Sequence, residues 1–112
     1  MTNSHWSSSE KKIAQRVYRS AVDRELAEIM ADFKERAANA RTPADIWAVE
    51  HHLTRTRKQF DSKYDFRYSQ LTWVFGILLR EKRIEVKELD GLAEEKLRSI
   101  QALADILENS GK

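Results

Sequence analysis

The stretch ARTPAD, residues 40–45, decides the fold because it separates two long helical patterns. Thr42 is a good N-cap, Pro43 suits the first position of a helix, and Asp45 places negative charge near the positive end of the helix dipole. The sequence therefore predicts that one helix ends here and that another begins at once. Two long helices joined by so short a turn form an antiparallel hairpin.

The helix before this turn is predicted to begin at Ser7, since Glu10 three residues later completes a capping-box pattern. Its apolar residues fall on two stripes instead of one. The early stripe consists of Ile13, Val17 and Ala21, and the later one of Val22, Leu26, Ile29 and Phe33. Two stripes indicate two different neighbours along the helix. Residues 1–7 are expected to form a disordered lead-in.

The helix after the turn carries its apolar residues on one face, namely Ile46, Val49, Leu53, Phe60 and Tyr64. The stretch DSKYD, residues 61–65, is expected to bend or end it, and Asp61 or Ser62 is available to cap a third helix. That third helix has the strongest core stripe, formed by Tyr68, Leu71, Thr72, Phe75, Leu78 and Leu79. Gly76 inside it costs up to about 1 kcal/mol relative to alanine, which indicates close packing at this point.

The remaining chain is also helical in pattern. EVKELDGL, residues 85–92, predicts a short helical turn that ends at Gly91, and a last helix is predicted over 93–108. The predicted head core comprises Tyr68, Leu71, Phe75, Leu78, Leu97, Ile100 and Leu103. Because the sequence contains neither strand alternation nor a repeat, we predict a single all-α domain over 8–112, with stalk helices over 8–62 and a helical head over 63–109.

The charge balance and composition bound the function. Of the 112 residues 34% are charged, yet the net charge is only +2, which argues against a dedicated polyanion binder. A basic cluster leaves nucleic-acid binding as a weaker alternative; it comprises Arg55, Arg57, Lys58, Lys63 and Arg67. There is no cysteine, no apolar run near the roughly 20 residues that cross a bilayer, and no signal peptide. We therefore expect a soluble cytoplasmic protein without integral membrane association.

Catalysis and metal binding are not predicted. The adjacent His51 and His52 point about 100° apart on a helix, whereas helical zinc ligands need a spacing of four residues. The sequence contains no Gly-rich phosphate loop, no nucleophile elbow and no carboxylate pair isolated from the ordinary surface charge. We expect no catalytic residue, no metal and no cofactor, and the protein is predicted not to be an enzyme.

Arg57 falls within the apolar face of the second predicted helix, with Glu50 at the edge of that face. A guanidinium in an apolar stripe is costly unless an acceptor lies nearby. Glu50 is two turns away, which is long for a pair within one helix, but the same carboxylate on an antiparallel symmetry mate comes closer. We predict a cross-subunit ion pair between Arg57 and Glu50. The alternative is that Arg57 extends to the rim without a defined partner.

Two further groups are candidates for binding another protein. The first shares a neighbouring stripe of the second helix and consists of Trp47, His51, Thr54 and Lys58. An aromatic ring beside basic and imidazole groups is typical of an interface hot spot, unless Trp47 only extends the core. The second lies opposite the core stripe of the third helix and consists of Phe66, Trp73 and Ile77. Either that helix is packed on both sides, or this patch receives a partner.

The hairpin alone leaves apolar surface uncovered, because its first helix carries two stripes. Pairing two hairpins about a twofold axis builds a four-helix stalk that buries both. The sequence therefore predicts an obligate or near-obligate homodimer.

The stretch DIWAVEHHLTRTRKQFDSKYDFRYSQLTWVFGILL (45–79), followed by KELDGLAEEKLRSIQALA (87–104), resembles the cyanobacterial fluorescence recovery protein family. The resemblance covers residues 17–107. It implies an all-α homodimer with long paired helices and a small head. It also implies a non-enzymatic regulator that binds photoactivated orange carotenoid protein, speeds its return to the orange form and helps to detach it from the phycobilisome. Such a protein is cytoplasmic, and in a cyanobacterium peripheral at the thylakoid membrane.

The resemblance also assigns residues. Trp47 matches the family's tryptophan in the dimer-interface helix, Arg57 its arginine, and Trp73 an aromatic on the head; KYD at 63–65 agrees as well. The chain departs from the family where Glu50 and His51 replace a His-Asp pair. This departure leaves open an alternative, namely a homodimeric helical adaptor with a different protein partner, in an organism without phycobilisomes.

Overall fold

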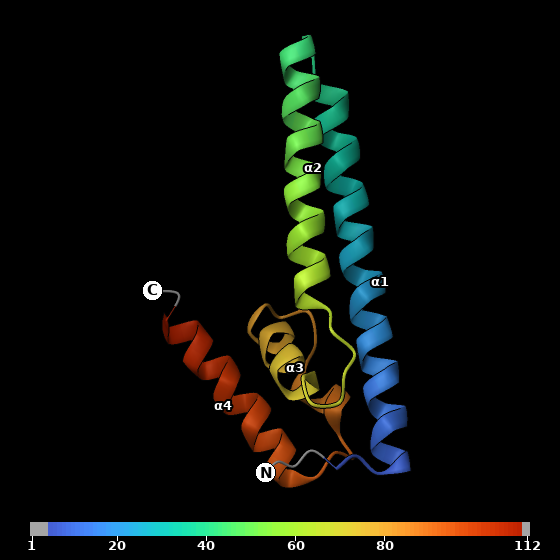
Figure 1. Ribbon diagram of the computed structural model, residues 1–112, viewed down its shortest axis with the longest axis vertical. Helices are drawn as coiled ribbons and strands as arrows, with labels where there is room; N and C mark the ends of the chain where they lie inside the picture. The colour runs from blue at the N-terminus through green and yellow to red at the C-terminus, as the bar shows by residue number, and fades with distance from the viewer. Residues whose placement is uncertain (1–4, 111–112) are drawn as a thin grey trace.

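The computed structural model describes residues 5–110, and within this range the chain is all-α, as predicted. It consists of α1 (Ser8–Asn39), α2 (Pro43–Lys63), α3 (Leu71–Arg80), the short 3₁₀ helix η1 (Val86–Leu89) and α4 (Glu94–Ser110). Figure 1 shows α1 and α2 side by side as a long hairpin, with α3 and α4 beside the end of the hairpin opposite its turn. None of the helices in 5–110 is long and apolar enough to cross a membrane.

Both predicted helix starts are confirmed by their hydrogen bonds. The Ser7 hydroxyl accepts from the Glu10 N–H at 3.2 Å, and the Glu10 carboxylate accepts from the Ser7 N–H at 3.0 Å. The same reciprocal arrangement joins Thr42 and Asp45, at 3.1 and 3.2 Å. Each capping box satisfies two backbone donors that a helix terminus otherwise leaves free. Only residues 40–42 separate α1 from α2, as the sequence predicted, and the two helices of the hairpin run antiparallel.

The third helix starts later than predicted. Asp61 and Ser62 lie in the last turn of α2, and they do not cap α3. Residues 64–70 form an irregular connection, and α3 begins after Gln70, whose side chain makes no capping hydrogen bond. The last helix covers 94–110 instead of 93–108. The composition of DSKYD favoured a helix cap at Asp61 or Ser62. In the structure α2 instead ends at Lys63, and Lys63 and Tyr64 both contact Glu25 of α1.

The hydrophobic core lies around α3, which packs on α4 on one side and faces the first half of α1 on the other (Figure 1). Its buried members include Ala14, Val17 and Ala21 from α1, Leu71, Val74, Phe75 and Leu78 from α3, Leu89 and Leu92, and Ile100 from α4. Of the predicted head core, Tyr68, Leu97 and Leu103 are only partly buried. The early stripe of α1 thus faces the head. One continuous helix serves both the hairpin and the head.

The predicted lead-in is not wholly disordered. Residues 1–4 lie outside the described residues, but Trp6 is only 4% exposed and belongs to the core. Its ring centroid lies 5.8 Å from that of Tyr68, and the Lys96 ammonium lies 5.0 Å from the Trp6 ring centroid. The expectation of disorder was therefore wrong at Trp6, because an isolated aromatic in a polar stretch gives no periodic signal.

At Gly76 the helices α3 and α4 pack closely, as its position inside a core stripe predicted. A Cβ added there would lie 2.8 Å from Leu103 Cβ, which is closer than real Cβ contacts. We expect Gly76→Ala to lower the free energy of unfolding by about 1–3 kcal/mol, because the helices must move apart. Urea denaturation at fixed protein concentration measures this effect. Ser99→Ala, at an exposed site of α4, is the control, and a more stable Gly76→Ala variant would contradict the close packing.

Candidate functional site: two exposed surfaces and their junction

The hairpin presents an apolar groove between α1 and α2. Its apolar lining is Leu26, Ile29, Leu53 and Phe60, and its polar lining is Thr54, Arg57, Lys58 and Asp61. The groove is open and has a volume of about 650 Å³. Leu26, Met30 and Phe33, which continue the later stripe of α1, are exposed in the single chain. The later stripe is therefore only partly covered by α2 within this chain, whereas Val17 and Ala21 of the early stripe are buried.

Arg57 is strongly exposed in the single chain, with 83% of its side-chain surface accessible. Its Nε lies 3.5 Å from Asp61 Oδ2, one helical turn away. Glu50 accepts a hydrogen bond from the Thr54 hydroxyl at 2.9 Å. Within one chain each of the two charged groups therefore has another partner, and the cross-subunit pair stays a prediction. The contact with Asp61 was missed, although its i,i+4 spacing signals it.

Trp47 lies on α2 near the hairpin turn and is 68% exposed, so it does not extend this chain's core. His51 and Lys58 are exposed as well. The neighbouring His52 turns toward α1, where its Nε2 lies 3.2 Å from Asp32 Oδ2. The hydrogen bond from Arg36 to Asp32 and, less strongly, the contact with His52 lower the pKa of that carboxyl. His51 therefore lies at the surface, whereas His52 takes part in the contact between α1 and α2.

Residues of the head patch are only partly brought together. Trp73 and Ile77 lie one turn apart on α3, with Trp73 47% exposed and Ile77 partly buried. Phe66 instead lies in the connection before α3 and packs edge-to-face on Tyr18, with ring centroids 4.8 Å apart. The prediction that Phe66 shares a helix face with Trp73 was wrong, because α3 starts later than expected.

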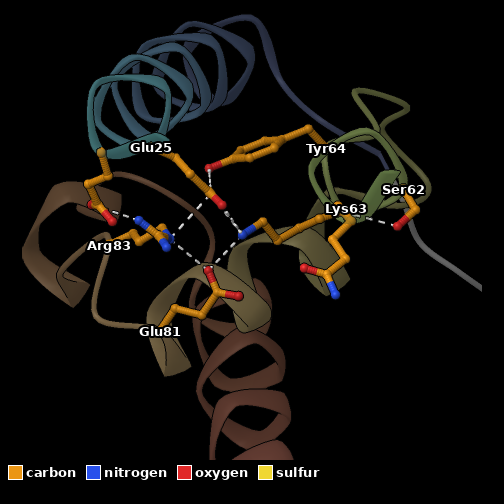
Figure 2. Close-up of polar contacts among 8 residues, drawn as sticks. Glu25, Ser62, Lys63, Tyr64, Glu81 and Arg83 are labelled. Carbon is orange, nitrogen blue, oxygen red and sulfur yellow. Dashed lines mark hydrogen bonds and ion pairs between the residues drawn. The ribbon is translucent and has the colours of Figure 1, made fainter. Parts of the chain in front are cut away.

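A cluster of charged groups occupies the junction between hairpin and head, and sequence reasoning missed it (Figure 2). The ammonium of Lys63, the last residue of α2, lies 2.7 Å from Glu25 of α1 and 2.8 Å from Glu81, which follows α3. The Tyr64 hydroxyl donates to Glu25 at 2.8 Å, and Arg83 Nε lies 2.8 Å from Glu81 and 3.2 Å from Glu25. We call these five residues the junction cluster.

Burial raises the pKa of the Tyr64 hydroxyl far above its usual value, and the hydrogen bond to Glu25 adds to this. Burial alone would lower the pKa of Arg83, but its bonds to Glu28 and Glu81 outweigh burial and raise it. Both side chains therefore keep their protons over the whole physiological range.

The basic residues that suggested nucleic-acid binding are largely neutralised by neighbours. Arg57 lies beside Asp61, Lys63 is enclosed by two carboxylates, and Arg67 pairs with Asp65 at 2.6 Å. Residues 5–110 contain no group of three or more side chains that could hold a metal ion.

The helical fold with two exposed apolar surfaces is typical of a protein that binds other proteins. The family model of the photoprotection regulator fluorescence recovery protein matches residues 6–104. This chain therefore belongs to the fluorescence recovery protein family.

Individual relatives agree with this assignment. The fluorescence recovery protein of Synechocystis sp. (strain ATCC 27184 / PCC 6803 / Kazusa) is 35% identical over 99 residues, which span 88% of this chain and 91% of that protein. The solved structure of the Fremyella diplosiphon fluorescence recovery protein gives a TM-score of 0.87 at 33% identity, over 90% of this chain and 99% of that one. The solved Synechocystis structure gives 0.86 at 35% identity, with the same coverage.

Proposed function

We propose that this protein binds photoactivated orange carotenoid protein in the cytoplasm and accelerates its return to the resting orange form. It would thereby end photoprotective quenching at the phycobilisome. The observation that carries this proposal is membership of the fluorescence recovery protein family over nearly the whole chain. The protein would act without covalent chemistry, because a ligand that binds one conformation of its partner more tightly shifts the population toward it.

We propose further that the active form is a homodimer. The later stripe of α1 and the hairpin groove are apolar and exposed, and a second hairpin is the surface that matches both. If the two α2 helices pair antiparallel with Glu50 beside Arg57 of the partner subunit, the twofold axis passes beside residues 53 and 54. Trp47 then lies opposite residues 60 and 61 of the partner subunit, next to the groove. The register of the two α2 helices that pairs Glu50 with Arg57 of the partner subunit would therefore also bury Trp47.

The surface for the carotenoid protein would combine both ends of the molecule. The stalk residues would be shared between the dimer interface and the surface for the carotenoid protein; they are Trp47, Glu50, His51, Thr54, Arg57 and Lys58. On the head that surface comprises Trp73 and Ile77, which are held on a well-packed helix. Phe66 packs on Tyr18 of α1 and is not itself a contact residue in this proposal.

The experiment that tests the function follows the dark relaxation of photoactivated orange carotenoid protein by its absorbance, with and without this chain. We expect faster relaxation that saturates with the concentration of this protein. No acceleration at stoichiometric excess would contradict the proposal.

That negative outcome would favour the second candidate, a homodimeric helical adaptor with another protein partner. The feature that favours this candidate is the pair Glu50 and His51, which replaces the family's His-Asp pair on the exposed face of α2. The double variant Glu50→His, His51→Asp would then be expected to restore the acceleration, because it returns the family's side chains to that face.

Trp73→Ala should weaken binding to the carotenoid protein about 30-fold while leaving the helix content unchanged, because a half-exposed aromatic on a rigid helix is a typical hot spot. Titration by fluorescence anisotropy with labelled carotenoid protein measures this. Val86→Ala, which removes another exposed apolar side chain of the head, is the matched control. Equal affinities for both variants would remove Trp73 from the contact surface.

A further inference from the structure

The junction cluster joins three parts of the chain that are distant in sequence. Glu25 comes from the middle of α1, Lys63 and Tyr64 from the end of α2, and Glu81 and Arg83 from the turn after α3. Figure 2 shows the side chains of these residues pointing toward one another, with the Lys63 ammonium between the carboxylates of Glu25 and Glu81. The cluster therefore lies where the hairpin passes into the head.

Lys63 is the shared partner at the centre of this arrangement. Its side chain is 13% exposed and that of Glu25 is 11% exposed, so solvent screens their attraction little. A buried ion pair contributes little net stability compared with apolar packing, but removing one partner leaves the other buried and uncompensated. Without Lys63, Arg83 would still bridge Glu25 and Glu81, but α2 would lose its ion pairs with both carboxylates. The cluster therefore selects one arrangement of the helices more than it stabilises the folded state as a whole.

The turn that carries Glu81 and Arg83 is itself held in an unusual conformation. Lys82 between them has φ 64°, in the left-handed region, where a side chain costs roughly 1–2 kcal/mol. The turn is closed by the Arg83 N–H, which donates to the Leu78 carbonyl at 3.0 Å, and by Arg24, which donates to the Arg83 carbonyl at 2.6 Å. This conformation directs both neighbouring side chains toward Glu25.

The link between α2 and the head depends on this cluster to an unusual degree. α2 carries the predicted stalk surface, yet none of its 21 residues is buried. After Lys63 the chain continues as the irregular connection 64–70, which by itself does not fix the direction of α3. The polar contacts of Lys63 and Tyr64, together with the packing of Tyr64 on Phe60 and Tyr18, tie this end of α2 to α1 and to the turn after α3.

We propose that Lys63 is a positioning residue, which through Glu25 and Glu81 holds the Trp73 face of the head at one fixed angle to the stalk surface of α2. This inference rests on the proposed function only in assigning those two surfaces to one partner. The fixed angle lets a single partner contact both surfaces at once. The second contact then forms within a complex that already exists, which raises the overall affinity.

A distance between two spin labels reports this angle. Because the chain contains no cysteine, two introduced cysteines can carry the labels at chosen sites. Labels at Ala48 on α2 and at Ala102 on α4, both exposed, report the distance between α2 and the head by pulsed electron paramagnetic resonance. Dilution with unlabelled protein removes distances between subunits. We expect one narrow distance distribution for the parent chain, and a distribution at least about twofold wider for Lys63→Met.

Two further variants make the result specific. Arg67→Met removes an exposed cation from the same connection, and the distribution should stay narrow. Lys63→Arg restores the positive charge and should narrow it again. A narrow, unshifted distribution for a folded Lys63→Met variant would overturn the proposal. If Lys63→Met does not fold, Tyr64→Phe removes only the hydrogen bond to Glu25 and should widen the distribution to a smaller extent; an unchanged width would likewise overturn the proposal.

The functional arm uses the relaxation assay of the carotenoid protein. Lys63→Met should need about tenfold more protein for half-maximal acceleration, whereas Arg67→Met should need no more than the parent chain. If the parent chain itself gives no acceleration, the proposed function fails but the distance measurement still decides the role of Lys63. If Lys63→Met widens the distance distribution but leaves the acceleration unchanged, the claim that one partner uses both surfaces at once is overturned.

Discussion

Replacing Leu26 by aspartate should convert the protein into a monomer without loss of helix. Leu26 is exposed in the single chain and lines the hairpin groove, so in the proposed dimer its side chain becomes buried at the subunit interface. A carboxylate at that position would be buried without a partner, which costs several kcal/mol. The dissociation constant of the dimer should therefore rise at least about 1,000-fold. Sedimentation velocity and light scattering at micromolar concentration measure the change.

Ala31→Asp is the matched control for this experiment. Ala31 is exposed on the same helix, about 140° around it from Leu26, and it does not line the groove. The same charge placed there should leave the dimer intact, and circular dichroism should give equal helix content for both variants. A parent chain that is monomeric at micromolar concentration would contradict the proposed dimer. A Leu26→Asp dimer of unchanged affinity would move the interface away from this groove.

Acid should remove a contribution of about 3 kcal/mol that Glu10 makes to the free energy of unfolding. Burial alone would raise the pKa of Glu10, but bonds from the Ser7 and Ala93 N–H groups and from the Lys96 ammonium outweigh burial and lower the pKa from 4.5 to about 2. The folded state therefore prefers the ionised carboxylate. The contribution is complete above about pH 4.5 and is lost as the pH falls toward 2.

Glu10→Gln isolates this contribution from that of the other acids. At pH 7 the variant should be less stable than the parent chain by up to about 3 kcal/mol, and the two unfolding curves should converge as the pH approaches 2. Chemical denaturation between pH 7 and pH 2 at constant protein concentration gives the difference. Glu94→Gln, which alters an exposed acid at the start of α4, is the control variant. A constant difference for Glu10→Gln would show that its carboxylate is not selectively stabilised in the folded state.

Features determined by neighbouring residues were predictable from the sequence. The two capping boxes at Ser7 and Thr42 follow from side chains three residues apart, and the hairpin follows from the short turn between them. The two stripes of α1 were also predictable, because helical periodicity assigns them to different faces. The close packing at Gly76 could be predicted as well, since a glycine inside a helical core stripe often has a packing reason.

Features that depend on contacts between distant residues were not predictable. Glu25, Lys63 and Glu81 each look like ordinary surface charges, and only the fold brings them within hydrogen-bonding distance. Phe66 was placed on α3 because no local signal separates residues 64–70 from a helix. Trp6 was assigned to a disordered segment because its partners, Tyr68 and Lys96, are far away in the chain.

The continuity of α1 bears on how such a protein can evolve. Its first half completes the core around α3, and its second half forms one side of the hairpin, on a single unbroken backbone of 32 residues. A gene fragment that encoded the stalk or the head alone would lack part of the helix that both share. Recombination would therefore not exchange the two parts as independent modules. Lineages would then inherit the molecule as one piece and diversify it by point substitution on its outer faces. The solved homologues, aligned over 99% of their length, fit that mode of descent.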